Sequence, residues 1–234
     1  MSTIEDHLAP VKALVGHLRW RAGEPGDGDL VGAALAADPA GLATLVAATA
    51  EGRGSDDPQV LGSLWWQAYA YRVGGTTLAA WALTGAAPDP SAPGTGVGSD
   101  RSRPSSLLVD PDAAIVSDLH DLVDRTFAGH LDRVAEALRD EHRLGTRLLW
   151  GNAAAGIASV LGALGSAEGA PDLTARMDEI VAALPHEIGS LGAWARPGWS
   201  FRRTTCCLWW KTTAAKGALC SDCSLHHAPD ADDP

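Results

Sequence analysis

Residues 57–83 read DPQVLGSLWWQAYAYRVGGTTLAAWAL and predict a buried helix. Asp57 is a good N-cap, the proline after it suits the first helical position, and apolar residues then recur at helical spacing. Five of the eleven Trp and Tyr residues lie between Trp65 and Trp81. We interpret these rings as core, the alternative being that one or two of them wall a ligand pocket. The pair Gly74-Gly75 predicts a kink or a break in this helix.

Helical periodicity recurs through most of the remaining chain. The further predicted helices cover residues 4–21, 30–37, 39–50, 117–142, 148–164 and 173–184. A single strand signal comes from the apolar runs on either side of Asp110-Pro111-Asp112, which predict a small β-hairpin over residues 107–116. The sequence therefore predicts a mostly α fold.

A stretch rich in Pro, Gly, Ser and Ala occupies residues 85–106. This composition is typical of a flexible connector, so we expect it to join two helical lobes. The predicted organisation is an N-terminal helical lobe (1–84), the connector (85–106), the β-hairpin with a C-terminal helical lobe (107–200), a cysteine-containing segment (201–225) and an acidic tail (226–234).

Composition and charge limit the possible functions. With 234 residues the chain can bury a sizeable core, and its net charge of −11 argues against non-specific nucleic-acid binding. Residues 1–6 carry acids where a secretory signal needs bases. The best membrane-span candidate, residues 148–167, is rich in Ala and Gly, so we predict a buried helix here and not a membrane span. We therefore expect a cytoplasmic protein without a transmembrane span.

All four cysteines lie within 18 residues, in the pattern C-C-x12-C-x2-C. In a reducing cytoplasm such a cluster is typical of metal ligands or redox groups. A disulfide between the neighbours Cys206 and Cys207 would close a strained ring. The compact spacing from Cys220 to Cys223 allows both sulfurs to reach one metal. Four thiolates suit a tetrahedral zinc ion, a [2Fe–2S] cluster or a [4Fe–4S] cluster, and the ligand count leaves these open.

The charge around the cysteines differs from that of the rest of the chain. Residues 188–221 contain five bases and no acid, which leaves a net charge of −16 on the remainder. Cations near thiolates lower the pKa of the thiols and favour an anionic centre. A basic segment also suits docking of an acidic electron donor. The candidate residues for a substrate or donor surface are Arg202, Arg203, Trp209, Trp210 and Lys211.

Three sequence motifs resemble those of the FhuF-type ferric-siderophore reductases. RRTTCCLWW at residues 202–210 and CSDCSL at 220–225 are similar to the family's C-terminal signature, and LLWGNAA at 148–154 to its internal helix motif. The resemblance implies that Cys206, Cys207, Cys220 and Cys223 hold a [2Fe–2S] cluster. The spacer of twelve residues is about two longer than is usual in the family.

The resemblance also implies a function. Members reduce an imported Fe(III)–siderophore, typically a hydroxamate, by one electron in the cytoplasm, and Fe(II) is then released. Since no flavin or nicotinamide motif is present, the electron would come from a separate donor such as a ferredoxin. We expect the substrate between the helix at 57–83 and the cysteine segment. The alternatives are an iron–sulfur electron-transfer or regulatory protein without a siderophore site, and a binding protein with a structural four-cysteine zinc site.

Overall fold

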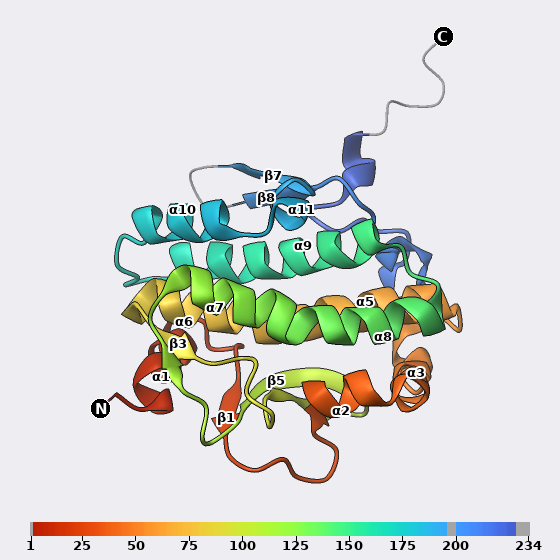
Figure 1. Cartoon of the computed structure of the whole chain (residues 1–234). Coiled ribbons are helices and arrows are strands. Elements are labelled where there is room, and N and C mark those ends of the chain that lie inside the picture. The colour runs from red at the N-terminus through yellow and green to blue at the C-terminus, as the bar shows by residue number, and fades with distance from the viewer. Residues whose placement is uncertain (1, 196–199, 228–234) are drawn as a thin grey trace.

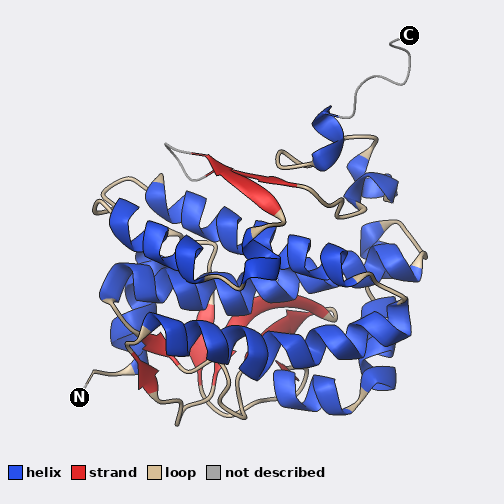
Figure 2. Cartoon of the chain, turned by 45° about the horizontal axis from the view of Figure 1, so that its top comes forward, coloured by secondary structure: helices blue, strands red, loops and turns tan. Residues whose placement is uncertain are grey.

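The computed structural model describes residues 2–195 and 200–227, in which helices dominate (Figures 1 and 2). The α-helices are α1 (Ile4–Leu14), α2 (Gly32–Ala37), α3 (Pro39–Ala47), α4 (Ala50–Arg53), α5 (Pro58–Ala70), α6 (Thr76–Thr84), α7 (Leu119–Thr126), α8 (Asp132–His142), α9 (Thr146–Gly165), α10 (Thr174–Ala183) and α11 (His186–Gly189). The π-helical turns are η1 (Tyr71–Gly75) and η2 (Phe127–Leu131), and the 3-10 turns are η3 (Trp209–Lys211), η4 (Thr213–Ala215) and η5 (Ser224–His227). The predicted mostly α fold is confirmed.

The strands of the described residues form three small sheets. They are β1 (Trp20–Ala22), β2 (Leu30–Val31), β3 (Ala87–Pro88), β4 (Gly96–Asp100), β5 (Arg103–Val109), β6 (Ile115–Val116), β7 (Gly192–Ala195) and β8 (Ser200–Arg203). The largest sheet has the order β1-β5-β4-β2, in which only β1 and β5 are parallel. The other two sheets are the antiparallel pairs β3-β6 and β7-β8.

The helix predicted at residues 57–83 forms the centre of the fold. The Asp57 side chain accepts a hydrogen bond from the Gln59 N–H at 2.9 Å and caps α5. The helix continues through η1 into α6, so the break expected at Gly74-Gly75 takes the form of a π turn. Figure 1 shows this helix and the α7–η2–α8 helix in a middle layer, with α9 and α10 on one side and the largest sheet on the other.

Aromatic side chains of α5 fill the core, as predicted. Trp65, Trp66 and Tyr69 are at most 1% exposed. The Trp66 indole N–H donates to the Leu149 carbonyl at 2.7 Å, so its polar atom is satisfied. The Tyr69 hydroxyl lies 2.7 Å from His130, and burial lowers the pKa of His130 to about 4. We therefore interpret these groups as a satisfied core and not as a ligand pocket.

The prediction of a flexible connector at residues 85–106 is wrong. This segment contains β3, β4 and the start of β5, and both Ala87 and Val97 are fully buried. A Cβ at Gly96 would overlap the carbonyl oxygen of Leu30, so glycine lets β4 approach β2 closely. The composition that suggested a loop instead serves tight strand packing.

The predicted β-hairpin over residues 107–116 is also wrong. β5 pairs with β1 and β4, whereas β6 pairs with β3, so the two apolar runs lie in different sheets. The predicted helix at 4–21 ends at Leu14, and β1 follows. The two-lobe layout is not confirmed, because one hydrophobic cluster extends from Leu8 to Phe201 and includes side chains from both predicted lobes.

Helix α9 confirms the helix predicted at 148–164. By length and composition it could cross a membrane, but 67% of its apolar window is buried inside this fold. Glycines on both elements allow α9 to pack closely against η1. A Cβ at Gly75 of η1 would lie 2.6 Å from Cγ2 of Val160, and one at Gly156 of α9 would lie 3.1 Å from the Tyr71 Cα. This contact fixes the distance between the central helix and α9.

We predict that Gly75→Val lowers the free energy of unfolding by about 1–3 kcal/mol, because the added side chain overlaps Val160. Chemical denaturation measures this. Val160→Ala should recover part of the loss in the double variant. Gly145→Val is the control, since no atom lies within 4 Å of a Cβ at Gly145. Equal losses for both glycine variants would contradict the role given to this contact.

Candidate metal centre

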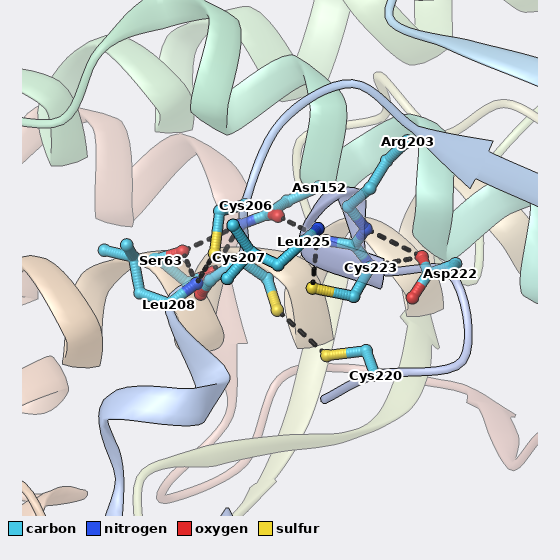
Figure 3. A network of polar contacts seen from close by, with 10 residues as sticks. All are labelled: Ser63, Asn152, Arg203, Cys206, Cys207, Leu208, Cys220, Asp222, Cys223 and Leu225. Carbon is cyan, nitrogen blue, oxygen red and sulfur yellow. Dashed lines mark hydrogen bonds and ion pairs between the residues drawn. The ribbon is translucent and has the colours of Figure 1, made fainter. Parts of the chain in front are cut away.

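The four cysteines come together where the cysteine segment lies beside α5 and α9 (Figure 3). None of the four forms a disulfide. Sγ of Cys207 lies 3.1 Å from Sγ of Cys220, and Cys206 is close enough to Cys223 for a charge there to affect its pKa. Cys207 and Cys223 are buried, whereas Cys206 and Cys220 are partly exposed. Each sequence pair therefore contributes one buried and one accessible sulfur.

The local backbone directs N–H groups at two of the sulfurs. The Leu208 N–H donates to Cys206 Sγ and the Leu225 N–H donates to Cys223 Sγ, both at 3.4 Å. Leu208 adopts a left-handed conformation with φ of 66°, which turns the chain directly after the vicinal pair. The contact from Leu208 favours the thiolate of Cys206 over its thiol.

The contact between Cys207 and Cys220 shifts the pKa values of the two thiols in opposite directions. A hydrogen bond from the Cys220 thiol, with help from the charge of Arg203, lowers the pKa of Cys207 to about 6. The same hydrogen bond raises the pKa of Cys220. Burial raises the pKa of Cys206. In this arrangement Cys207 is the sulfur best prepared to act as a thiolate ligand.

A buried arginine ties the C-x2-C loop to the helical body. Arg203 in β8 is 2% exposed. Its Nε donates to Asp222 Oδ2 at 2.7 Å, and its Nη2 contacts the same oxygen. Its Nη1 donates to the Asn152 Oδ1 in α9 at 2.8 Å. Since Asp222 lies between Cys220 and Cys223, the arginine fixes this loop against α9.

The same chain of hydrogen bonds continues to the vicinal pair. Asn152 Nδ2 donates to the Ser63 carbonyl at 3.0 Å and to Ser63 Oγ at 2.8 Å. Ser63 Oγ in turn donates to the Cys207 carbonyl at 2.8 Å (Figure 3). Ser63 and Asn152 are fully buried. Neither residue was predicted to belong to the site; the available signal for Asn152 was its place in the LLWGNAA motif.

Glycine is needed where the cysteine segment crosses α9. A Cβ at Gly151 would overlap Oγ1 of Thr205, the residue before the vicinal pair. On the opposite side of the segment, the Thr213 N–H donates to the Gly54 carbonyl at 3.1 Å. The segment is therefore attached to α9 and α4 as well as to α5.

The predicted surface residues have different environments. Arg202 and Lys211 are exposed, Trp209 is half-buried and Trp210 is 45% exposed. A hydrogen bond from the Trp210 side chain favours the thiolate of Cys206. Arg203 differs from the other four, because its guanidinium is buried and paired with Asp222, an acid just beyond the acid-free stretch. Residues 228–234 of the predicted acidic tail lie outside the described residues.

The donor set is four thiols, and the carboxylate of Asp222 in the same loop is paired with Arg203. Within residues 2–195 and 200–227, no three His, Cys, Asp or Glu side chains converge on one ion position. A structural zinc site places all four ligands around a single ion. A two-iron cluster needs only two thiolates at each iron, and its ligands are Cys alone in the four-cysteine form. The four thiols could supply this all-cysteine donor set.

A cavity of about 300 Å³ adjoins the C-x2-C loop. Gln67 of α5, the Arg203–Asp222 pair and Ser221 supply its polar groups, and α9 supplies a face of small residues. A larger cavity of about 820 Å³ lies between residues 2–5 and 111–115. It is at the N-terminal end of the molecule, away from the cysteines (Figure 1), so it is not part of this site.

Residues 63–186 match the family model described as ferric iron reductase FhuF-like transporter. The chain belongs to this FhuF-like family. The matched region covers more than half of the chain and includes both Ser63 and Asn152, and it ends before the cysteine segment. The family description indicates an iron-related protein with ferric iron reductase activity. No curated protein sequence matches the chain.

We predict that Arg203→Gln lowers the stability of the cysteine segment by about 3 kcal/mol, because the carboxylate of Asp222 loses its cation. A faster reaction of Cys207 and Cys223 with a thiol reagent would report this loss. Arg203→Gln combined with Asp222→Asn should be less damaging than the single change. Arg139→Gln, which removes an exposed ion pair with Asp140, should leave the rate unchanged. An unchanged rate in the single Arg203 variant would contradict the anchoring role.

Proposed function

We propose that this FhuF-like protein is a cytoplasmic ferric-siderophore reductase whose Cys206, Cys207, Cys220 and Cys223 hold a [2Fe–2S] cluster. The observation that supports the proposal most directly is the meeting of these four sulfurs on a helical body of the ferric reductase family. When bound, the cluster would supply electrons one at a time. One electron converts the Fe(III) of the substrate to Fe(II), and the electron donor is oxidised by one electron.

The surroundings of the sulfurs suit this task. Arg203 is a buried cation whose charge reaches Cys207 and Cys220, so it favours a thiolate set and a centre that gains negative charge. The Leu208 N–H directed at Cys206 also favours the thiolate of that residue. The buried Cys207 and Cys223 keep one side of the centre dry, while the partly exposed Cys206 and Cys220 bring its other side to the surface.

The cavity beside the C-x2-C loop is our candidate substrate site. It lies mainly between α9 and the cysteine segment, and Gln67 is the residue that α5 contributes to its lining. The small side chains of α9 can accept the methylene arms of a hydroxamate siderophore, and Gln67 and Ser159 can bond its amide groups. After reduction, the hard oxygen ligands hold Fe(II) less tightly than Fe(III), because the charge of the ion is lower and its radius larger.

An electron donor would approach from outside the cavity. Arg202 and Lys211 are exposed next to the cysteines and present positive charge. This surface suits an acidic donor such as a ferredoxin. A reducing cytoplasm would keep the four thiols available as ligands.

We predict that protein purified without air contains about two iron and two sulfide per chain and gives an iron–sulfur EPR signal on reduction. Cys207→Ser and Cys220→Ser should lose both iron and signal, while circular dichroism shows an intact helical body. Ser221→Ala, within the same loop, is the matched control and should keep the cluster. A colourless protein with stoichiometric zinc would contradict the proposal.

We predict that Ser159→Trp slows electron transfer to a ferric hydroxamate by about tenfold or more, because the indole would fill the cavity. Stopped-flow oxidation of the reduced protein, with an Fe(II) trap, measures the rate. The EPR signal should not change. Ser166→Trp is the control, because Ser166 is the C-cap of α9 and lies outside the cavity. If no ferric siderophore oxidises the reduced wild-type protein, the carrier alternative replaces the reductase.

A further inference from the structure

Three arginines lie close together near the spacer of the cysteine segment, with no acidic partner among the described residues. Arg53 ends α4, Arg72 lies in η1 and Arg103 begins β5. The guanidinium of Arg103 rests on Gly52, where a Cβ would overlap its Nη2, and β5 packs against η1. All three side chains are half-buried. They therefore bring three positive charges together from distant parts of the sequence.

No ion pair among the described residues involves these three arginines. The Nε atoms of Arg72 and Arg103 are buried and have no hydrogen-bond partner. Arg72 donates from Nη1 to the Ala68 carbonyl at 3.1 Å and lies over the Tyr71 ring at 5.6 Å, and neither contact neutralises its charge. Burial, together with the charges of Arg103 and Arg72, lowers the pKa of Arg53. Folding thus assembles like charges that oppose one another.

Irregular backbone places two of these arginines. Arg72 lies in a π-helical turn, a feature frequently found at functional sites. Arg103 follows a tight turn in which Arg101 and Ser102 have φ of 49° and 64°, and the Ser102 carbonyl accepts a hydrogen bond from the Trp65 indole at 3.0 Å. The turn is therefore fixed to the central helix and holds Arg103 over α4.

The three-arginine cluster lies near the spacer of the cysteine segment. The carbonyl of Gly54, next to Arg53, accepts the hydrogen bond from Thr213 in the spacer between Cys207 and Cys220. A ligand held by the arginines would therefore lie beside the cysteine segment.

We propose that Arg53, Arg72 and Arg103 bind the carboxylates of an anionic, polycarboxylate-type ferric chelate. Guanidinium groups pair with carboxylates through two parallel hydrogen bonds, and a polyanion would neutralise the repelling charges. A neutral tris-hydroxamate complex offers no such compensation. The site thus adds a second substrate class to the hydroxamates. The inference rests on the proposed function for the electron that the chelate receives, whereas binding itself needs neither the cluster nor a donor.

Gallium(III) citrate tests the site, because gallium is not reduced and binding is measured alone. We expect calorimetry to show binding that weakens with salt, and at least about tenfold weaker binding in Arg53→Gln, Arg72→Gln and Arg103→Gln. Arg101→Gln, on the exposed part of the same turn, is the matched control and should bind like wild type. A neutral gallium(III) tris-hydroxamate should bind all variants equally.

Thermal unfolding separates a binding role from a structural one. Without ligand, Arg53→Gln should melt at or above the wild-type temperature, because a repelled charge is removed. Gallium(III) citrate should raise the melting temperature of wild type but not of this variant. The proposal is overturned if wild type does not bind gallium(III) citrate or if all variants bind it equally. If the protein still reduces ferric hydroxamates after such a result, the proposed reductase function stands and only the chelate site is rejected.

Discussion

The buried contact between Arg203 and Asp222 is the interaction on which the candidate metal centre depends. A guanidinium that is 2% exposed must find partners for its donors, and here they come from the C-x2-C loop and from Asn152. Asn152 also bonds Ser63, which holds the Cys207 carbonyl. Both halves of the cysteine motif are thus positioned by one polar chain between two core helices. The cysteine segment, outside the family match, is joined to residues inside it.

That chain requires α5 and α9 to lie close together. Glycines provide the spacing, at Gly75 and Gly156 between α9 and η1, which continues α5, and at Gly151 beneath the cysteine segment. The aromatic core of α5 adds rigidity, since the Trp66 indole is bonded to the backbone of α9. The precise placement of reactive sulfurs in a segment of short turns therefore comes from the packing of the helices below it.

The helices could be predicted because apolar periodicity is a local property of the sequence, as the capped stretch at 57–83 illustrates. The strands could not. Residues 85–106 resemble a connector, yet Gly96 and Val97 lie in a buried strand whose neighbours are Leu30 and β5. Strand pairing joins segments far apart in sequence, so a local pattern such as that at 107–116 does not identify its partner.

The sequence alone determined the four-cysteine pattern, its spacing, the helical character of the chain and the motifs that resemble the FhuF family. Tertiary structure decided which sulfurs meet, Cys207 with Cys220, and which charges are exposed. It buried Arg203, which the charge count had placed on a surface, and it gathered Arg53, Arg72 and Arg103 from three separate segments. Composition and spacing describe neighbours along the chain, whereas burial and pairing depend on neighbours in space, which only the packed fold supplies.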